Sequence, residues 1–155
     1  MTSRRDFLVL ACGALSGAAH AQLPPDIQAK RKAAAEAALR KVTGGAELRQ
    51  GKVKLDIPPL IDNGNAVPLT VTVDSPMTEK DYVKAIHVLT EKNPQPNVVS
   101  VHLGPRAGRA SITTRVRLAD TQTVTAIAQL SDGPLWVDRV PVVVTLSACL
   151  EDGLI

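Results

Sequence analysis

Alternation of apolar and polar residues dominates the chain from residue 48 onward. Successive side chains of a strand point to opposite faces, so an alternating run offers one apolar face to a core. Four runs have this period, with core-side residues Val67, Leu69, Val71 and Val73; Ile112, Thr114, Val116 and Leu118; Val124, Ala126, Ala128 and Leu130; Val140, Val142, Val144 and Leu146. With shorter candidates at 53–55, 83–90 and 98–103, the pattern predicts about seven strands.

Turn-forming residues separate these runs. They are Asp62-Asn63-Gly64-Asn65, Asp74-Ser75-Pro76, Asn93-Pro94-Gln95-Pro96-Asn97, Gly104-Pro105 and Asp132-Gly133-Pro134. Such residues break regular structure, and strands at this spacing are typical of an immunoglobulin-like sandwich. We therefore predict an all-β fold, an immunoglobulin-like β-sandwich over residues 47–147, without the Cys-Trp-Cys core of antibody domains.

The segment before the strands, residues 22–46, is rich in Ala, Lys and Arg. Asp26 follows two prolines as a candidate N-cap, and Gly44-Gly45 is a candidate stop. The apolar stripe is weak and Arg31 interrupts it. We expect an N-terminal helix that packs loosely on the sandwich or on a partner and adds little to the main core.

The composition narrows the classes of function. The chain has 155 residues, enough for one domain, and aromatic residues make up 2% of them, so the core must be aliphatic. The net charge is +3, with acids and bases interspersed and no basic cluster interleaved with aromatic residues. These features argue against a nucleic-acid partner.

The N-terminus indicates the compartment. Residues 3–8, Ser-Arg-Arg-Asp-Phe-Leu, form a twin-arginine pattern, and an apolar run to Ala19 precedes an Ala-His-Ala cleavage site. That run is too short to span a bilayer. We predict a twin-arginine signal peptide over residues 1–21 and a periplasmic protein that is exported folded and not embedded in the membrane. The alternative is a lipoprotein signal with Cys12 lipidated, which the sequence around it matches poorly.

Removal of the signal peptide leaves Cys149 as the single cysteine of the mature chain. A lone thiol in an exported protein is intermolecular, buried or reactive. Continued alternation places Leu146 and Ala148 on the core face and Cys149 on the outer side of a C-terminal arm, residues 148–155. No histidine follows, so we assign no catalytic residue; a carrier thiol acted on by partner enzymes needs no local base.

Two histidines are weaker candidates. His87 and His102 fall in predicted strands, and together with Cys149 they are the residue types of a copper or zinc site. No ligand spacing supports such a site, and no phosphate-binding glycine loop is present. We therefore predict no metal and no cofactor, and keep a metal-binding protein as a third and weaker function.

A basic segment surrounds Pro105 and contains Arg106, Arg109, Arg115 and Arg117. One interpretation is the solvated outer face of a hairpin, which the alternation of Arg115 with Arg117 favours. The other is a surface that attracts an acidic partner or an anion such as thiosulfate.

Several sequence blocks resemble the SoxY family, the sulfur carriers of the periplasmic thiosulfate-oxidising (Sox) system. Residues 62–68, Asp-Asn-Gly-Asn-Ala-Val-Pro, resemble its ENGNAVP-type segment. Further blocks follow in the family's order at 74–77, 81–83, 91–96, 105–110, 114–119 and 132–133. The resemblance covers residues 47–149 and includes the twin-arginine signal and the single C-terminal cysteine.

This resemblance implies a heterodimer with a second sandwich subunit of the SoxZ type. It also implies that Cys149 holds sulfur intermediates covalently. A c-type cytochrome complex would attach thiosulfate and a sulfate-releasing hydrolase would act on the adduct, so the carrier is not itself an enzyme. The family arm ends Gly-Gly-Cys-Gly-Gly, whereas here Ser147-Ala148 precede the cysteine and Leu150-Glu151 follow it. Glycines give an arm its freedom, so the alternative function is a SoxY-like scaffold with a non-carrier cysteine.

Overall fold

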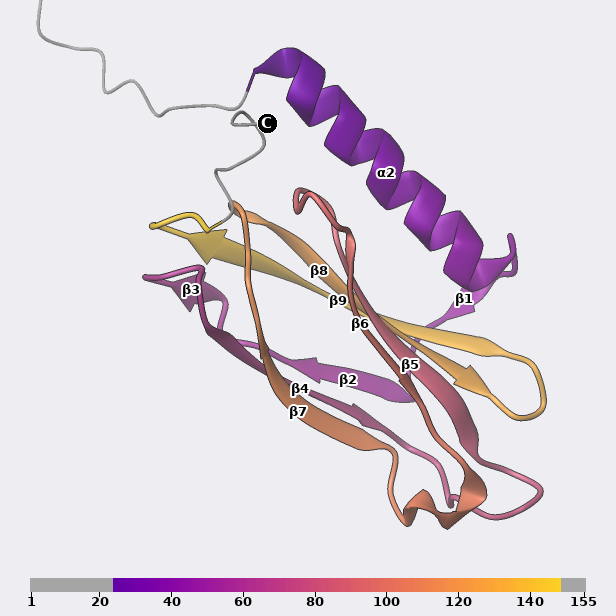
Figure 1. Ribbon diagram of the computed structural model, residues 1–155. Coiled ribbons are helices and arrows are strands. Elements are labelled where there is room, and N and C mark those ends of the chain that lie inside the picture. The colour runs from indigo at the N-terminus through magenta and orange to yellow at the C-terminus, as the bar shows by residue number, and fades with distance from the viewer. Residues whose placement is uncertain (1–23, 149–155) are drawn as a thin grey trace, which may run out of the picture.

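The computed structural model describes residues 24–148, which form two β-sheets and one helix (Figure 1). The helix α2 spans Pro25–Thr43, and a short 3₁₀ turn, η1, spans Pro105–Ala107. The strands are β1 (Leu48–Arg49), β2 (Val53–Asp56), β3 (Leu60–Ile61), β4 (Val67–Val73), β5 (Val83–Thr90), β6 (Asn97–His102), β7 (Ser111–Val116), β8 (Gln122–Leu130) and β9 (Leu135–Val144). The predicted signal peptide and Cys149 lie outside the described residues.

The sheets pack face to face, as the alternation predicted. The larger, six-stranded sheet has the order β1-β9-β8-β5-β6, with β3 also paired to β9, and the smaller sheet has the order β2-β4-β7. Pairs within the main body of both sheets are antiparallel. The two-residue strands β1 and β3 instead pair in parallel with opposite ends of β9. The all-β sandwich with an N-terminal helix is thereby confirmed.

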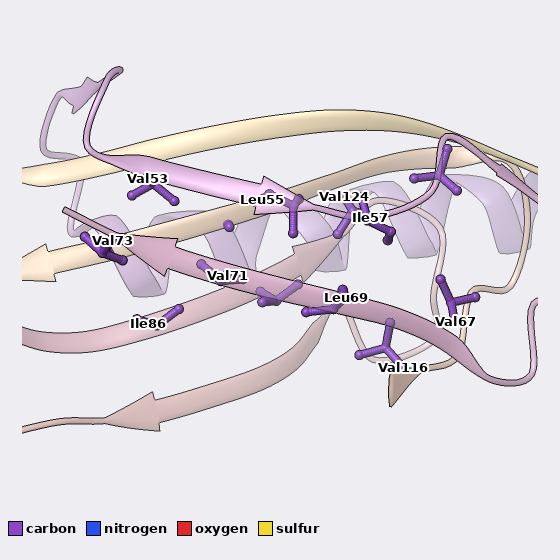
Figure 2. Packing of buried hydrophobic residues seen from close by; sticks show 14 of the residues in the cluster. Val53, Leu55, Ile57, Val67, Leu69, Val71, Val73, Ile86, Val116 and Val124 are labelled. Atoms are coloured by element: carbon purple, nitrogen blue, oxygen red, sulfur yellow. The ribbon is translucent and has the colours of Figure 1, made fainter. Parts of the chain in front are cut away.

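Aliphatic side chains fill the space between the sheets (Figure 2). The predicted inward residues of β4 are all at most 4% exposed, whereas Pro68 and Thr72 between them face solvent. They meet inward residues of the other strands, among them Val53, Leu55, Ile86, Val88, Val116, Val124 and Val142. Burial of this aliphatic surface is the main source of stability.

Helix α2 adds a second, smaller core on the outer face of the larger sheet. Its residues Ala38, Leu39 and Val42 pack on Leu89, Ile127, Leu135 and Val137. Strand β8 is therefore buried on both faces, which the alternation alone did not predict. Within residues 24–148, no helix combines the length and apolar character that a membrane span requires.

Arg31 anchors the other half of α2. The side chain is 4% exposed, and its guanidinium donates to the Lys92 carbonyl at 2.7 Å. The helix contributes no residue to the main core, as expected, but Arg31, which interrupts its apolar stripe, is itself buried and bonded. Gly44 ends the helix in the left-handed conformation as predicted, but Pro24 and not Asp26 occupies the N-cap position.

The last strand ends earlier than the alternation predicted. β9 stops at Val144, and Leu146 is 58% exposed although we placed it on the core face. Ala148 is 3% exposed, as expected. The chain leaves the sheet after Val144 because its next backbone groups bond to other segments, and this change of path shifts the register of the inward positions.

Candidate functional site

Cys149 lies one residue beyond the described chain, so the site is defined by the residues that hold the chain up to that point. We call residues 145–148 the arm root. Three of its four residues make hydrogen bonds to segments that are far away in sequence. These bonds decide where the cysteine-bearing segment departs from the sandwich.

Gly64 lies at the centre of this arrangement. Its amide donates to the Leu146 carbonyl at 2.8 Å, and its carbonyl accepts from the Leu118 amide at 2.8 Å. The Leu118 carbonyl in turn accepts from the Ala148 amide at 3.0 Å. These three bonds, which we call the backbone clamp, join the predicted turn at 62–65, the end of the β7 segment and the arm root.

The residues before Gly64 also form hydrogen bonds with the arm root. The Thr145 amide donates to the Ile61 carbonyl of β3 at 2.9 Å, and the Thr145 hydroxyl donates to the Asp62 carbonyl at 3.0 Å. Asn63 closes the turn by accepting from the Asn65 amide at 2.9 Å. Asn and Asp favour such turns because their side chains substitute for backbone acceptors. The whole stretch from β3 to Asn65 thus supports the arm root.

Asn93 holds the other side of the clamp. Its side chain is 4% exposed, donates to the Arg117 carbonyl at 2.7 Å, and accepts from the Ala119 amide at 2.9 Å and from the Gln122 side chain at 3.0 Å. The Gln122 side chain accepts from the Lys92 amide at 2.8 Å. This buried polar network fixes the backbone on both sides of Leu118.

Asn93→Ala is therefore expected to lower the free energy of unfolding by about 3 kcal/mol, because it leaves several buried polar groups without partners. Chemical denaturation would measure the change. Asn97→Ala is the matched control, since exposed Asn97 bonds only to the exposed Ser100 side chain among side chains of residues 24–148. Equal effects from the two substitutions would contradict the assigned role of Asn93.

The predicted basic segment is divided between two places. Arg115 and Arg117 are exposed at the end of β7 next to Leu118, and they line a groove of about 460 Å³ with Asn97 on β6. Arg106 lies in η1 and Arg109 follows it in the loop to β7, at the opposite end of the sandwich from β3 (Figure 1). Only the first pair lies near the arm root, so the four arginines do not form one surface.

The two histidines lie side by side on β5 and β6. Their ring centroids are 6.1 Å apart in an edge-to-face arrangement, and His87 Nδ1 is 2.8 Å from the Ser100 hydroxyl. Burial, and secondarily the nearby His102, hold the pKa of His87 below 6.5. Among residues 24–148, no group of three metal-ligating side chains occurs, and the third predicted ligand, Cys149, lies outside them.

The lowered pKa of His87 predicts a pH dependence of stability. Unfolded His87 takes up its proton at a higher pH than folded His87, so the stabilisation is complete above about pH 6.5 and is lost as the pH falls through the lowered pKa. Urea midpoints measured from pH 7.5 to 5 should fall less steeply for His87→Gln. His102→Gln removes only the charge effect of His102 and leaves His87 buried, so the urea midpoint of this variant should keep most of its dependence on pH. An unchanged slope in His87→Gln would refute this assignment.

A second groove, of about 680 Å³, lies between α2 and the sheet. Apolar side chains such as Leu39 and Leu89 line it together with charged ones such as Lys32, Glu91 and Arg139. The weak apolar stripe of the helix gave no indication of this groove.

The comparisons with known proteins agree with this architecture. The family model "Sulfur oxidation protein SoxY" matches residues 39–149. The sulfur carrier protein SoxY from Chlorobium limicola f thiosulfatophilum has 24% identity and a TM-score of 0.61, and the match covers 74% of this chain and 98% of that one. No curated protein sequence matches the chain at a significant level.

Superoxide reductases share the same fold. The enzyme from Ignicoccus hospitalis has 17% identity and a TM-score of 0.55, over 61% of this chain and 80% of that one. The enzyme from Nanoarchaeum equitans has 10% identity and a TM-score of 0.51, over 62% and 100%. At these identities the likeness concerns the fold alone, whereas the family match covers most of the sequence and ends at the cysteine. The chain belongs to the SoxY family of sulfur oxidation proteins.

Proposed function

We propose that this protein is a sulfur carrier that holds thiosulfate-derived sulfur covalently on Cys149 and presents it to partner enzymes. The observation that carries the proposal is the family match, which runs through the sandwich and includes Cys149 as its last residue. The solved protein of similar fold from Chlorobium limicola is itself described as a sulfur carrier. The anchored arm root supplies a fixed base for such a thiol.

The chemistry of loading requires an oxidant from outside the chain. Joining the Cys149 thiol to the sulfane sulfur of thiosulfate forms an S–S bond and releases one proton and two electrons. We assign the electrons to a c-type cytochrome partner. Hydrolysis of the terminal S–S bond would then release sulfate and a proton and leave a persulfide on Cys149. The protein itself contributes the thiol and its placement.

The surroundings of the arm root support a carrier over an enzyme. In the described chain, the hydrogen bonds of the arm root join it to backbone amides and carbonyls of other segments. None of these groups is a base that would activate a thiol. Activation is therefore assigned to the partner's active site.

The partners and the compartment are part of the same proposal. We assign a second sandwich subunit of the SoxZ type as the permanent partner, and the conjugating cytochrome and sulfate-releasing hydrolase as transient ones. The twin-arginine pattern at residues 3–8 supports export of the folded protein to the periplasm. Exposed Arg115 and Arg117, close to the arm root, would favour the approach of an anion such as thiosulfate.

Intact-mass spectrometry tests the proposal. The purified protein is incubated with thiosulfate and the conjugating cytochrome partner, and peptide mapping then locates any added mass. The expected result is one thiosulfate-derived group on Cys149 that a reducing thiol removes. A chain that never gains this mass under conditions in which another SoxY-family carrier does so would end the carrier proposal.

The second candidate is a SoxY-like scaffold with an inert cysteine. Ser147 and Ala148 stand where the family has two glycines, and the buried Ala148 side chain favours a more constrained segment. Thiol labelling of the native protein separates the two candidates. Rapid labelling of Cys149 supports the carrier, whereas labelling only after unfolding supports the scaffold.

A further inference from the structure

We infer that Gly64 is a positioning residue whose backbone clamp fixes the path of the arm root up to Ala148, the residue that precedes Cys149 in the sequence. The importance of this placement for sulfur carriage rests on the proposed function. The clamp itself is a property of the described residues and is tested separately.

A side chain at position 64 would not fit. Gly64 is buried, and an added Cβ would press into the Leu118 carbonyl oxygen and come within 3.1 Å of the Ala148 nitrogen and of the Leu146 oxygen. All three of these atoms belong to the clamp. Glycine is thus required for close approach of three backbone segments, which is one of the uses of a residue without a Cβ.

Gly104 shows that this requirement is specific to position 64. Gly104 precedes η1 with φ of −125°, and an added Cβ there meets nothing within 4 Å. Neither glycine has the left-handed φ that would itself penalise a side chain. Substitution by alanine therefore differs between the two positions only in the space available.

The clamp holds the chain in place as far as Ala148. The Ala148 amide is bonded to Leu118 and its side chain is 3% exposed. The Cα atom of the next residue lies only about 3.8 Å further along the chain. We therefore expect a partner that acts on Cys149 to approach this edge of the sandwich.

The surface at this edge is suited to such contact. The exposed large hydrophobic side chains of residues 24–148 are Leu60, Val143 and Leu146. Leu60 and Val143 are paired across β3 and β9, and Leu146 bonds to Gly64 through its carbonyl. Exposed apolar side chains that gather in one place mark contact surfaces more often than isolated ones do.

Distance measurements between two spin labels test the clamp without any partner. The full chain with Cys12→Ser and Cys149→Ser carries one nitroxide on Leu146→Cys, which is exposed in the arm root, and one on Arg109→Cys, in the loop between η1 and β7 at the opposite end of the sandwich (Figure 1). We expect a narrow distance distribution that Gly64→Ala broadens or shifts and Gly104→Ala leaves unchanged. A distribution that is already broad before substitution, or is unaltered by Gly64→Ala, would overturn the inference.

The rate of sulfur loading tests the functional part. Gly64→Ala should slow adduct formation with the conjugating partner by roughly 10–100-fold, the usual cost of misplacing a reacting group. Reaction of Cys149 with iodoacetamide should stay within about twofold, because a small reagent needs no positioning. If the loading rate does not change, Gly64 is not a positioning residue.

A second variant covers the case in which Gly64→Ala fails to fold. Ala148→Pro removes the amide that donates to the Leu118 carbonyl and leaves Gly64 in place. Like Gly64→Ala, it should alter the spin-label distance distribution and slow sulfur loading. Circular dichroism and the thermal midpoint report whether each variant folds. If the reference protein is never loaded with sulfur, the proposed function fails while the spin-label distances still decide on the clamp.

Discussion

Cys149→Ser is expected to abolish the sulfur adduct completely and to change the free energy of unfolding by less than about 0.5 kcal/mol. The loss is complete because a hydroxyl cannot form a stable S–S bond with thiosulfate, and Cys149 is the last residue of the family match. The fold should persist because the described core ends at Ala148. Intact-mass spectrometry and thermal denaturation measure the two effects.

Cys12→Ser is the matched control for this experiment. Cys12 belongs to the predicted signal peptide, and its substitution should leave the adduct at the reference level. An adduct that survives Cys149→Ser, or disappears in Cys12→Ser, would contradict the assignment of the attachment site. Loss of folding in Cys149→Ser would instead show that the thiol has a structural role.

Val71→Asp is expected to unfold the protein or to lower the free energy of unfolding by more than about 4 kcal/mol. Val71 is fully buried in the middle of β4, between Leu55 on β2 and Ile112 on β7 (Figure 2). A carboxylate at this position would lose its hydration without gaining a partner. Because domains of this size are stable by about 5–15 kcal/mol, the loss is a large share of the total.

Thr72→Asp is the control on the same strand. Thr72 is exposed on the opposite face, directly across from Lys54 on β2, so a carboxylate there stays hydrated and meets a positive neighbour. Denaturant titration should show a change of less than about 1 kcal/mol for Thr72→Asp. Similar losses from the two substitutions would mean that the inward face of β4 is wrongly assigned.

The fold was predictable wherever one face of a strand is buried and the other is solvated. β4 follows this rule, and its alternation gave the correct inward residues. Strand β8 does not, because α2 also buries its other face at Ile127. Periodicity cannot show which outer positions a helix will cover, since this depends on contacts between segments far apart in sequence.

The candidate site was harder to predict, because backbone groups form most of it. The turn chemistry of 62–65 was evident, but nothing in that segment indicates that Gly64 will bond to Leu118 and Leu146. The exposed position of Leu146 has the same origin, since the clamp and not the strand period determines the path of the chain after Val144. Asn93 was read as part of a turn, and its burial depends on the 117–122 segment that lies against it.

The parallel pairing of β1 with β9 determines how far the chain can be truncated from its N-terminus. It fixes the C-terminal end of α2 above Leu135 and Val137, and the family match begins at residue 39, inside this helix. A proteolytic fragment starting near residue 47 would lack α2 and would expose the apolar outer face of the larger sheet to water. Such fragments should self-associate and precipitate, whereas cleavage before Pro25 should be harmless.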